Sequence, residues 1–137
     1  MRIIVATDGS EQAMKAVTKA LELAEKEGNE VYILSVAYYA KEDMDEMPAN
    51  IQDKLEGEAR KALEKAKKIF DEKKIKVETI LETDVVPANA IIRKSKEMKC
   101  DHILMGSTGR TGIERTIIGS TAAKVVSQAP CSVTVIK

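Results

Sequence analysis

Ile3-Ile4-Val5-Ala6-Thr7-Asp8-Gly9-Ser10 is an apolar run that ends in a short polar loop. A continuous apolar run of this kind predicts a strand that is buried on both faces of a sheet. After it, apolar side chains recur at helical spacing through residues 13–24, with Ser10 as the expected N-cap and Gly28 as the residue that ends the helix. The stretch therefore predicts a strand, a tight loop and a helix, which begin a β-α-β unit.

The same alternation of apolar runs and helical patterns continues to the end of the chain. Further strands are expected at Val31–Val36, Ile75–Leu81, Ile103–Met105 and Val133–Ile136. Helices are expected between them, at 55–69, from Pro87 to Met98 and at Ser120–Gln128. With 137 residues, the chain fits one domain, 1–137, in which a parallel sheet is covered by helices on both faces.

The hydrophobic patterns of the strands also predict their order. The first, second and fourth runs are continuously apolar, as expected for central strands, whereas residues 75–78 and 132–135 alternate, as expected nearer an edge. With right-handed crossovers, this pattern fits an α/β fold with a doubly wound five-stranded parallel sheet of order 3-2-1-4-5. The winding then reverses between strands one and four, where such sheets bind ligands outside the carboxyl ends of their strands.

Two glycine-rich clusters follow the fourth strand, in a loop that would flank this reversal. Gly106-Ser107-Thr108-Gly109 is separated by nine residues from Gly119-Ser120. Glycine lets the backbone approach a ligand closely, and Ser and Thr add hydroxyl donors beside the exposed amides. If Ser120 opens a helix, its N–H groups and positive dipole end face the same anion. The loop therefore predicts a phosphate cradle opposite residues 7–10.

The composition narrows the classes of partner. Lys plus Arg and Asp plus Glu number 22 each, so no net basic charge favours nucleic acid. No charged-then-apolar leader follows Met1, and no apolar stretch approaches the ~20 residues of a membrane helix, so a soluble cytoplasmic protein without a membrane partner is expected. Cys100 and Cys131 lack metal or redox spacing and are expected to be buried thiols.

Three stretches carry a resemblance to a known family. They are residues 3–10, the pattern G-x2-G-x9-G-[S/T] formed by Gly106, Gly109, Gly119 and Ser120, and the closing residues 129–136. On these stretches, the whole chain resembles a universal stress protein of the nucleotide-binding type, with the adenine nucleotide hydrolase-like fold. The resemblance implies that the chain binds ATP.

The resemblance also implies which residues hold the nucleotide. Asp8 and the backbone of Val36 lie toward the adenosine end, and Met105 and Gly106 line the pocket. The phosphates are surrounded by Gly109, Gly119, Ser120 and Thr121. Ala6 stands where some ATP binders carry proline, and a backbone contact from Ala6 or Thr7 would not need the proline ring.

The chemistry of these residues supports a phosphorylated ligand, with plainer interpretations beside it. Arg110 is available to meet phosphate charge, and Asp8 suits ribose hydroxyls or a phosphate-bound Mg²⁺. Asp8 is also typical of a turn former before a helix, and Arg110 of a solvated surface charge. Ser107 and Thr108 serve either the ligand or the structure of the loop.

The sequence argues for holding a nucleotide more than for breaking one. His102, the only histidine, lies within a strand about three residues from its carboxyl end, so packing is favoured over catalysis. No nucleophile elbow, P-loop or dinucleotide fingerprint is present, and no metal-ligand spacing. With no evident general base and no catalytic residue to name, any ATP hydrolysis should be slow or need a partner.

Two further segments suggest interactions. Residues 40–57 are charged and lack a clear period, so we expect a mobile loop on the ligand side, either a lid, a docking loop or a plain connection. Residues 132–136 form an exposed edge strand, and pairing with the same strand of a second copy would cover it. The resemblance implies this homodimer.

We therefore expect an ATP-binding homodimer that acts as a nucleotide-dependent sensor or switch in stress response. The alternatives are a slow or partner-activated ATPase and a dimeric interaction module without a ligand. The stress signal, any protein partner and the choice among ATP, ADP and AMP lie beyond the residues themselves.

Overall fold

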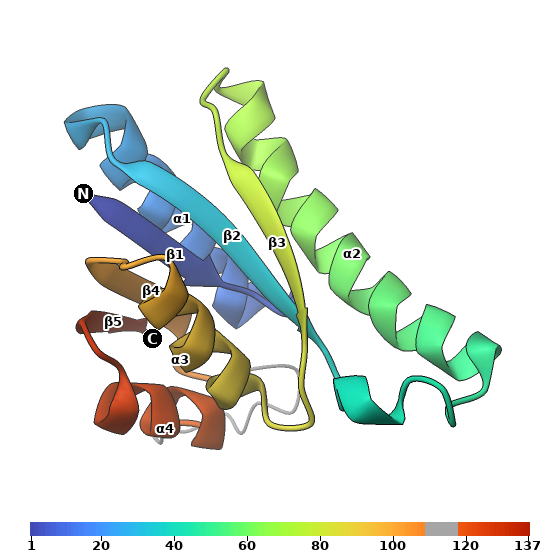
Figure 1. The fold of residues 1–137 in the computed structure, drawn as a ribbon. Helices are drawn as coiled ribbons and strands as arrows, with labels where there is room; N and C mark the ends of the chain where they lie inside the picture. The colour runs from blue at the N-terminus through green and yellow to red at the C-terminus, as the bar shows by residue number, and fades with distance from the viewer. Residues whose placement is uncertain (109–117) are drawn as a thin grey trace.

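A five-stranded sheet with helices on both faces forms the computed structural model (Figure 1), which describes residues 1–108 and 118–137. The strand order is β3-β2-β1-β4-β5, and all neighbouring pairs are parallel, so the predicted doubly wound topology is confirmed. The strands are β1 (Arg2–Ala6), β2 (Glu30–Ala37), β3 (Glu78–Thr83), β4 (His102–Gly106) and β5 (Ser132–Ile136). The α-helices are α1 (Glu11–Glu27), α2 (Ala49–Glu72), α3 (Pro87–Glu97) and α4 (Ser120–Gln128).

The predicted ends of α1 are confirmed by the hydrogen bonds at each terminus. Ser10 accepts a hydrogen bond from the Ala13 N–H through its hydroxyl at 3.2 Å, which satisfies one of the unpaired donors of the first turn. Gly28 adopts a left-handed backbone with φ of 68° and donates to the Ala24 carbonyl at 3.1 Å. These local signals fix where the chain leaves β1 and where it returns to β2.

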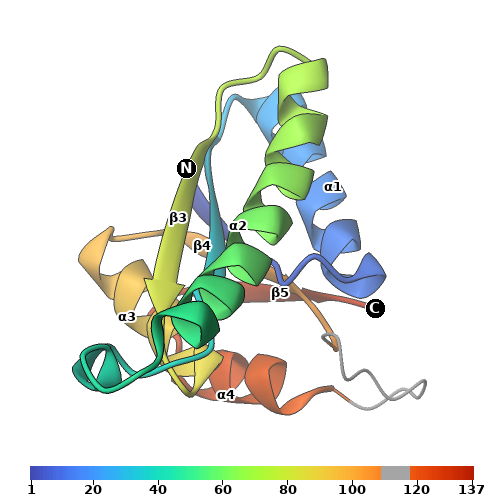
Figure 2. The ribbon, with the colours of Figure 1, turned by 90° about the vertical axis from the view of Figure 1, so that its right-hand side faces the viewer.

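The two helix layers bury two separate apolar cores. In one core, α1 and α2 pack against the odd-numbered residues of β1, such as Ile3 and Val5. In the other, α3 and α4 pack against Ile4 and Ala6. Figure 2 shows α1 and α2 on one side of the sheet and α3 on the other. Because β1 is buried on both faces, its continuous apolar run is explained.

The third strand begins later than its alternating pattern predicts. The prediction was Ile75–Leu81, but β3 is Glu78–Thr83, and its first partner in β2 is Tyr32. Residues before Glu78 are still turning away from α2, because the Ile75 N–H donates to the Phe70 carbonyl at 3.0 Å. Ile75 and Val77 nevertheless pack against the core under α1 and α2, which accounts for the apolar alternation in their sequence.

The segment predicted as a loop at 40–57 is divided differently. A short 3-10 helix covers Lys41–Asp43, and α2 already begins at Ala49, so residues 49–57 are helical rather than part of the connection. Tyr39 is buried with Ala37 and Ala59, and Met44, Met47 and Leu55 pack against them. This third small core holds the connection against α2.

His102 packs within the sheet as predicted, and of the two cysteines Cys100 is buried as predicted whereas Cys131 is only half-buried. The His102 Nε2 and Thr134 Oγ1 atoms are 2.6 Å apart, a hydrogen bond between the neighbouring strands β4 and β5. Cys100 and Cys131 are both free thiols. Burial raises the pKa of Cys100 to about 11 and also raises the pKa of Cys131, so neither thiol is activated as a nucleophile. Within the described part of the chain, no helix combines the length and apolar composition needed to cross a membrane.

Candidate functional site

The loops that follow β1 and β4 lie at the same edge of the sheet. β1 pairs directly with β4, with Ile3 opposite His102 and Val5 opposite Leu104. The two strands end at Ala6 and Gly106, and their following segments lead into α1 and toward α4. Since α1 and α4 cover opposite faces, the winding reverses here, which is where doubly wound sheets bind ligands.

Local hydrogen bonds shape the first of these loops, Thr7–Ser10. The Thr7 N–H donates to the Leu34 carbonyl at 2.9 Å, which extends the β1–β2 ladder by one residue. The Thr7 hydroxyl accepts from the Gly9 N–H at 3.1 Å, and the Asp8 carboxylate accepts from the Ser10 N–H at 3.0 Å. Gly9 has φ of 83°, a conformation that favours glycine. The loop therefore presents Asp8, half-buried, at the edge beside β4.

The second loop brings Gly119 back against the end of β4. The Gly119 N–H donates to the Ser107 carbonyl at 2.6 Å, and Gly119 immediately precedes α4. Ser120, as predicted, is the first residue of this helix. The N–H groups of its first turn have no partner within the helix, and the positive end of the helix dipole lies at the same place. This arrangement is suited to an anion.

Gly106 is required by packing. A Cβ on Gly106 would lie 2.9 Å from the Gln12 carbonyl oxygen and 3.1 Å from the Ala13 nitrogen, which are backbone atoms of α1. Gly106 is also buried, and its missing side chain lets α1 approach β4 closely. Its place in the glycine pattern is thus explained by close packing of helix and strand.

The other predicted site residues are distributed around this edge. Ala6 and Thr7 are buried, and Met105 is buried in the core beneath α3 and α4, so each would offer mainly backbone to a ligand. Val36, half-buried in β2, lies two residues beyond Leu34, the partner of Ala6. Thr121 lies in the first turn of α4. Gly109 and Arg110, also predicted for the site, fall outside the described residues.

One residue that the sequence did not suggest joins three elements at this edge. Gln12, in the first turn of α1, donates through Nε2 to the Ile136 carbonyl at 2.7 Å and to the Ser107 hydroxyl at 3.2 Å. The Ser107 N–H also donates to the Ile136 carbonyl, at 2.8 Å. Ser107 is therefore engaged in the loop structure, the plainer of its two interpretations. A glutamine near a helix start carries no sequence signal for such a role, because its partners are distant in the chain.

A buried tyrosine holds the connection after β2 against α2. The Tyr39 hydroxyl donates to Glu56 Oε1 at 2.5 Å, and Arg60 lies 3.6 Å from the same carboxylate. The hydrogen bond from Tyr39 lowers the pKa of Glu56 below its ordinary value of 4.5. The same bond, together with burial, raises the pKa of Tyr39 above 10.0. Both shifts favour the pair with Glu56 ionised and Tyr39 neutral.

Replacing Tyr39 by phenylalanine should therefore give a loss of stability that depends on pH. A lowered folded-state pKa makes Glu56 stabilising above about pH 4.5, and this contribution is lost as the pH falls through the folded-state value. Near pH 7 we expect Tyr39→Phe to lower the free energy of unfolding by about 1 kcal/mol. Urea unfolding of both proteins at pH 7 and pH 3 measures the difference. A gap that is equally large at both pH values would contradict the assignment.

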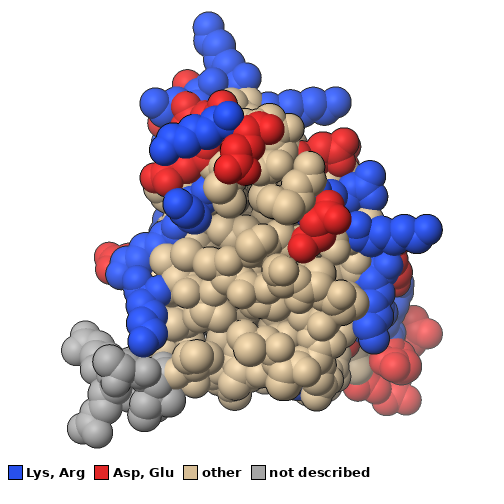
Figure 3. Space-filling model, turned by 90° about the vertical axis from the view of Figure 1, so that its left-hand side faces the viewer, with Lys and Arg blue, Asp and Glu red and all other residues tan. Residues whose placement is uncertain are grey.

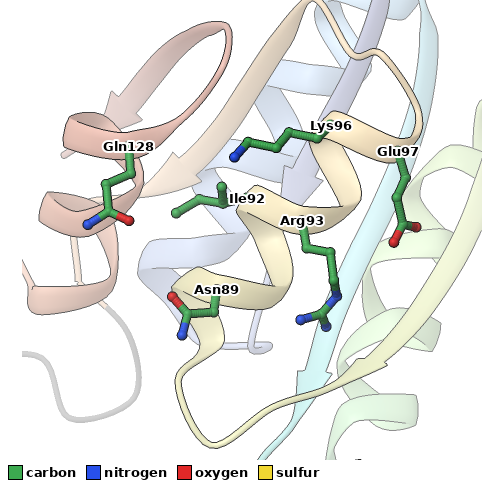
Figure 4. A pocket seen from close by; sticks show the side chains of 6 residues that line it. All are labelled: Asn89, Ile92, Arg93, Lys96, Glu97 and Gln128. Carbon is green, nitrogen blue, oxygen red and sulfur yellow. The ribbon is translucent and has the colours of Figure 1, made fainter.

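A separate groove of about 420 Å³ lies between α3 and α4. It is lined by Asn89, Ile92, Arg93, Lys96, Glu97 and Gln128. In Figure 4, Lys96 extends from α3 toward α4, which carries Gln128, and Ile92 lies between the two helices. None of the predicted site residues that the structure describes lines this groove. Among residues 1–108 and 118–137, no three His, Cys, Asp or Glu side chains are grouped to hold a metal ion.

Comparison with known proteins identifies the family. The model of the universal stress protein family matches residues 1–137. The chain belongs to this family. It is 36% identical to a universal stress protein of Methanocaldococcus jannaschii, over 99% of this chain and 81% of that protein.

Solved structures of universal stress proteins share the fold. The protein UspA of Lactobacillus plantarum has a TM-score of 0.85 at 26% identity, covering 100% of this chain and 97% of that one. A universal stress protein of Archaeoglobus fulgidus, solved in complex with dAMP, has a TM-score of 0.76 at 24% identity, covering 100% of this chain and 98% of that one. At that identity the likeness establishes the fold.

Proposed function

We propose that this universal stress protein binds ATP between the Thr7–Ser10 loop and the start of α4, and acts as a nucleotide-dependent switch. The observation that carries the proposal is that Asp8 and the first-turn N–H groups of α4, which have no partner within the helix, flank one reversal point of the sheet. A carboxylate suits ribose hydroxyls, and a helix N-terminus suits phosphate. The dAMP complex of the Archaeoglobus fulgidus protein supports an adenine nucleotide as the ligand class.

The described residues fit such a ligand at both of its ends. Toward the base and ribose, the backbone at Ala6, Thr7 and Val36 would offer N–H and carbonyl groups beside the Asp8 carboxylate. Toward the phosphates, the Ser120 and Thr121 N–H and hydroxyl groups would donate, with Gly109 and Arg110 completing the set. If Mg²⁺ accompanies ATP and Asp8 faces the phosphates instead of the ribose, phosphate oxygens and the Asp8 carboxylate would hold the ion. The metal would neutralise phosphate charge.

The proposed role is to hold ATP and respond to its presence. With this role we propose a cytoplasmic location, where ATP is available. The nucleotide found in the purified protein distinguishes the candidate functions. Protein denatured after purification should release ATP, identified by mass spectrometry, and calorimetric titration should give saturable binding. Released ADP or AMP would favour slow hydrolysis, while no released nucleotide and no binding would favour a dimeric module without ligand.

We further propose that β5 pairs with β5 of a second copy. β5 is an end strand of the sheet, and its residues Val133–Ile136 are half-buried. The side of the molecule seen in Figure 3, where β5 forms the edge, has a broad area free of Lys, Arg, Asp and Glu. An uncharged face and an unpaired strand edge both favour contact with another copy.

Proline at position 135 should separate the copies without unfolding them. The Ile136 carbonyl accepts from Ser107 and so faces β4, which means that the Val135 N–H faces the open edge. Val135→Pro removes this outward donor and should shift a dimer to monomer in sedimentation velocity at micromolar concentration. Val135→Ala, which keeps the N–H, controls for the lost side chain. A wild-type monomer, or a dimeric proline variant, would rule out this interface.

A further inference from the structure

Helix α2 reaches the Thr7–Ser10 loop from outside the β1–α1 unit. The Lys65 Nζ atom donates to the Gly9 carbonyl at 2.8 Å. The helix also approaches the loop closely at Ala62, since a Cβ placed on Gly9 would lie 3.3 Å from the Ala62 Cβ. Lys65 and Ala62 are three residues apart and so share one face of the helix. One face of α2 thus contacts Gly9 twice, by packing and by a charged donor.

The Lys65 bond differs from the side-chain bonds within this loop, while the start of the loop is already tied to β2 by the Thr7–Leu34 backbone bond. The bonds to Thr7 and Asp8 side chains join residues two apart in the sequence, and the Ser10 cap joins residues three apart. Such local bonds turn the chain without tying Gly9 to another element of the fold. Lys65 is 56 residues away, so its bond ties the middle of the loop, at Gly9, to α2.

We propose that Lys65 is a positioning residue for the bound nucleotide. By holding the Gly9 carbonyl, it keeps Asp8 and the start of α1 in the place from which Asp8 meets the ribose. The inference rests on the proposed function, because it concerns the affinity of that site. Ordering a flexible loop when a ligand binds lowers the affinity. If the loop is already ordered in the free protein, this loss is avoided. A hydrogen bond from an ammonium group is stronger than one between two neutral groups. Lys65 is exposed, so solvent weakens its bond to the Gly9 carbonyl.

The test compares nucleotide affinity in three variants by calorimetry. Lys65→Met keeps the apolar stem and removes the donor, and should weaken binding about fivefold to tenfold. Lys65→Arg supplies another cationic donor and should restore most of the affinity. Lys61→Met changes an exposed lysine on the same helix and should bind like the wild type. The melting temperature of each variant is measured beside its affinity.

Comparing adenosine, AMP and ATP separates positioning from direct contact. If Lys65 acts through the loop, Lys65→Met should weaken all three ligands by the same factor. A loss that grows from adenosine to ATP would mean that Lys65 itself meets phosphate, and would overturn the positioning role. Unchanged affinity with a lower melting temperature would show a purely structural role and also overturn it.

A second measurement tests how well the Thr7–Ser10 loop is ordered in the protein without ligand. Hydrogen exchange of the Gly9 and Ser10 amides should be faster in Lys65→Met than in the wild type and in Lys61→Met. Equal exchange in all three would contradict the proposal. If the wild type binds nucleotide and Lys65→Met binds it equally well, the positioning role fails while the proposed function stands. If the wild type binds no adenine nucleotide, the proposed function itself fails.

Discussion

Gly106→Ala should destabilise the fold by about 2–3 kcal/mol, although it adds one methyl group. The added carbon would lie 2.9 Å from the Gln12 carbonyl oxygen, 3.0 Å from the Gln12 carbonyl carbon and 3.1 Å from the Ala13 nitrogen. All three are backbone atoms of α1, so no side-chain rotation relieves the overlap. The helix must move away from β4, which disturbs both the core beneath it and the Ser10 cap.

The measurement is thermal or urea unfolding, with Gly57→Ala as the matched control. Gly57 lies within α2, and a Cβ there meets nothing within 4 Å. The same change should therefore raise stability, by about 0.5–1 kcal/mol, because alanine favours helix over glycine. Gly106→Ala should lower the melting temperature by roughly 6–12 °C. Equal melting of Gly106→Ala and wild type would mean that α1 does not approach β4 this closely.

Gly119→Val should weaken nucleotide binding by about 30-fold or more while the protein remains folded. A Cβ at this position would lie 3.2 Å from the Ser107 carbonyl oxygen and 3.5 Å from the Thr108 Cα. The two further methyl groups of valine would occupy the space before the first turn of α4, from which the N–H groups are proposed to meet phosphate. Gly119 has φ of −64°, so the effect comes from lost space rather than from backbone strain.

The binding measurement needs controls for the helix and for the size of the added group. Ser127→Val places the same side chain at the exposed far end of α4 and should leave affinity unchanged. Gly119→Ala should give an intermediate loss. The melting temperature of Gly119→Val should remain within a few degrees of the wild type. Retained affinity in a folded Gly119→Val protein would show that the phosphates lie elsewhere.

Local sequence was sufficient for the elements and their order. The Ser10 cap, the left-handed Gly28 and the start of α4 at Ser120 depend on residues within one turn of one another, so short-range patterns predicted them. The contrast between continuous and alternating apolar runs predicted which strands are central. The predicted starts of β3 and α2 were wrong. In both places apolar side chains pack against a core, but the element does not begin at the first of them. Ile75 and Val77 are apolar for that reason, and Leu55 continues the small core around Tyr39.

The candidate site, like the fold, has features that the sequence predicted and features that only the structure revealed. The pairing of residues 7–10 with the loop after β4 follows from strand order, and so could be read from the chain. The roles of individual residues could not be predicted from the sequence. Gly106 looks like a ligand contact in the motif but is needed where α1 crosses β4. Gln12 and Lys65 carry no motif at all, yet they bond to Ile136 and Gly9. Hydrophobic period and caps are local properties of a chain, whereas these contacts join residues brought together only when the helices pack onto the sheet.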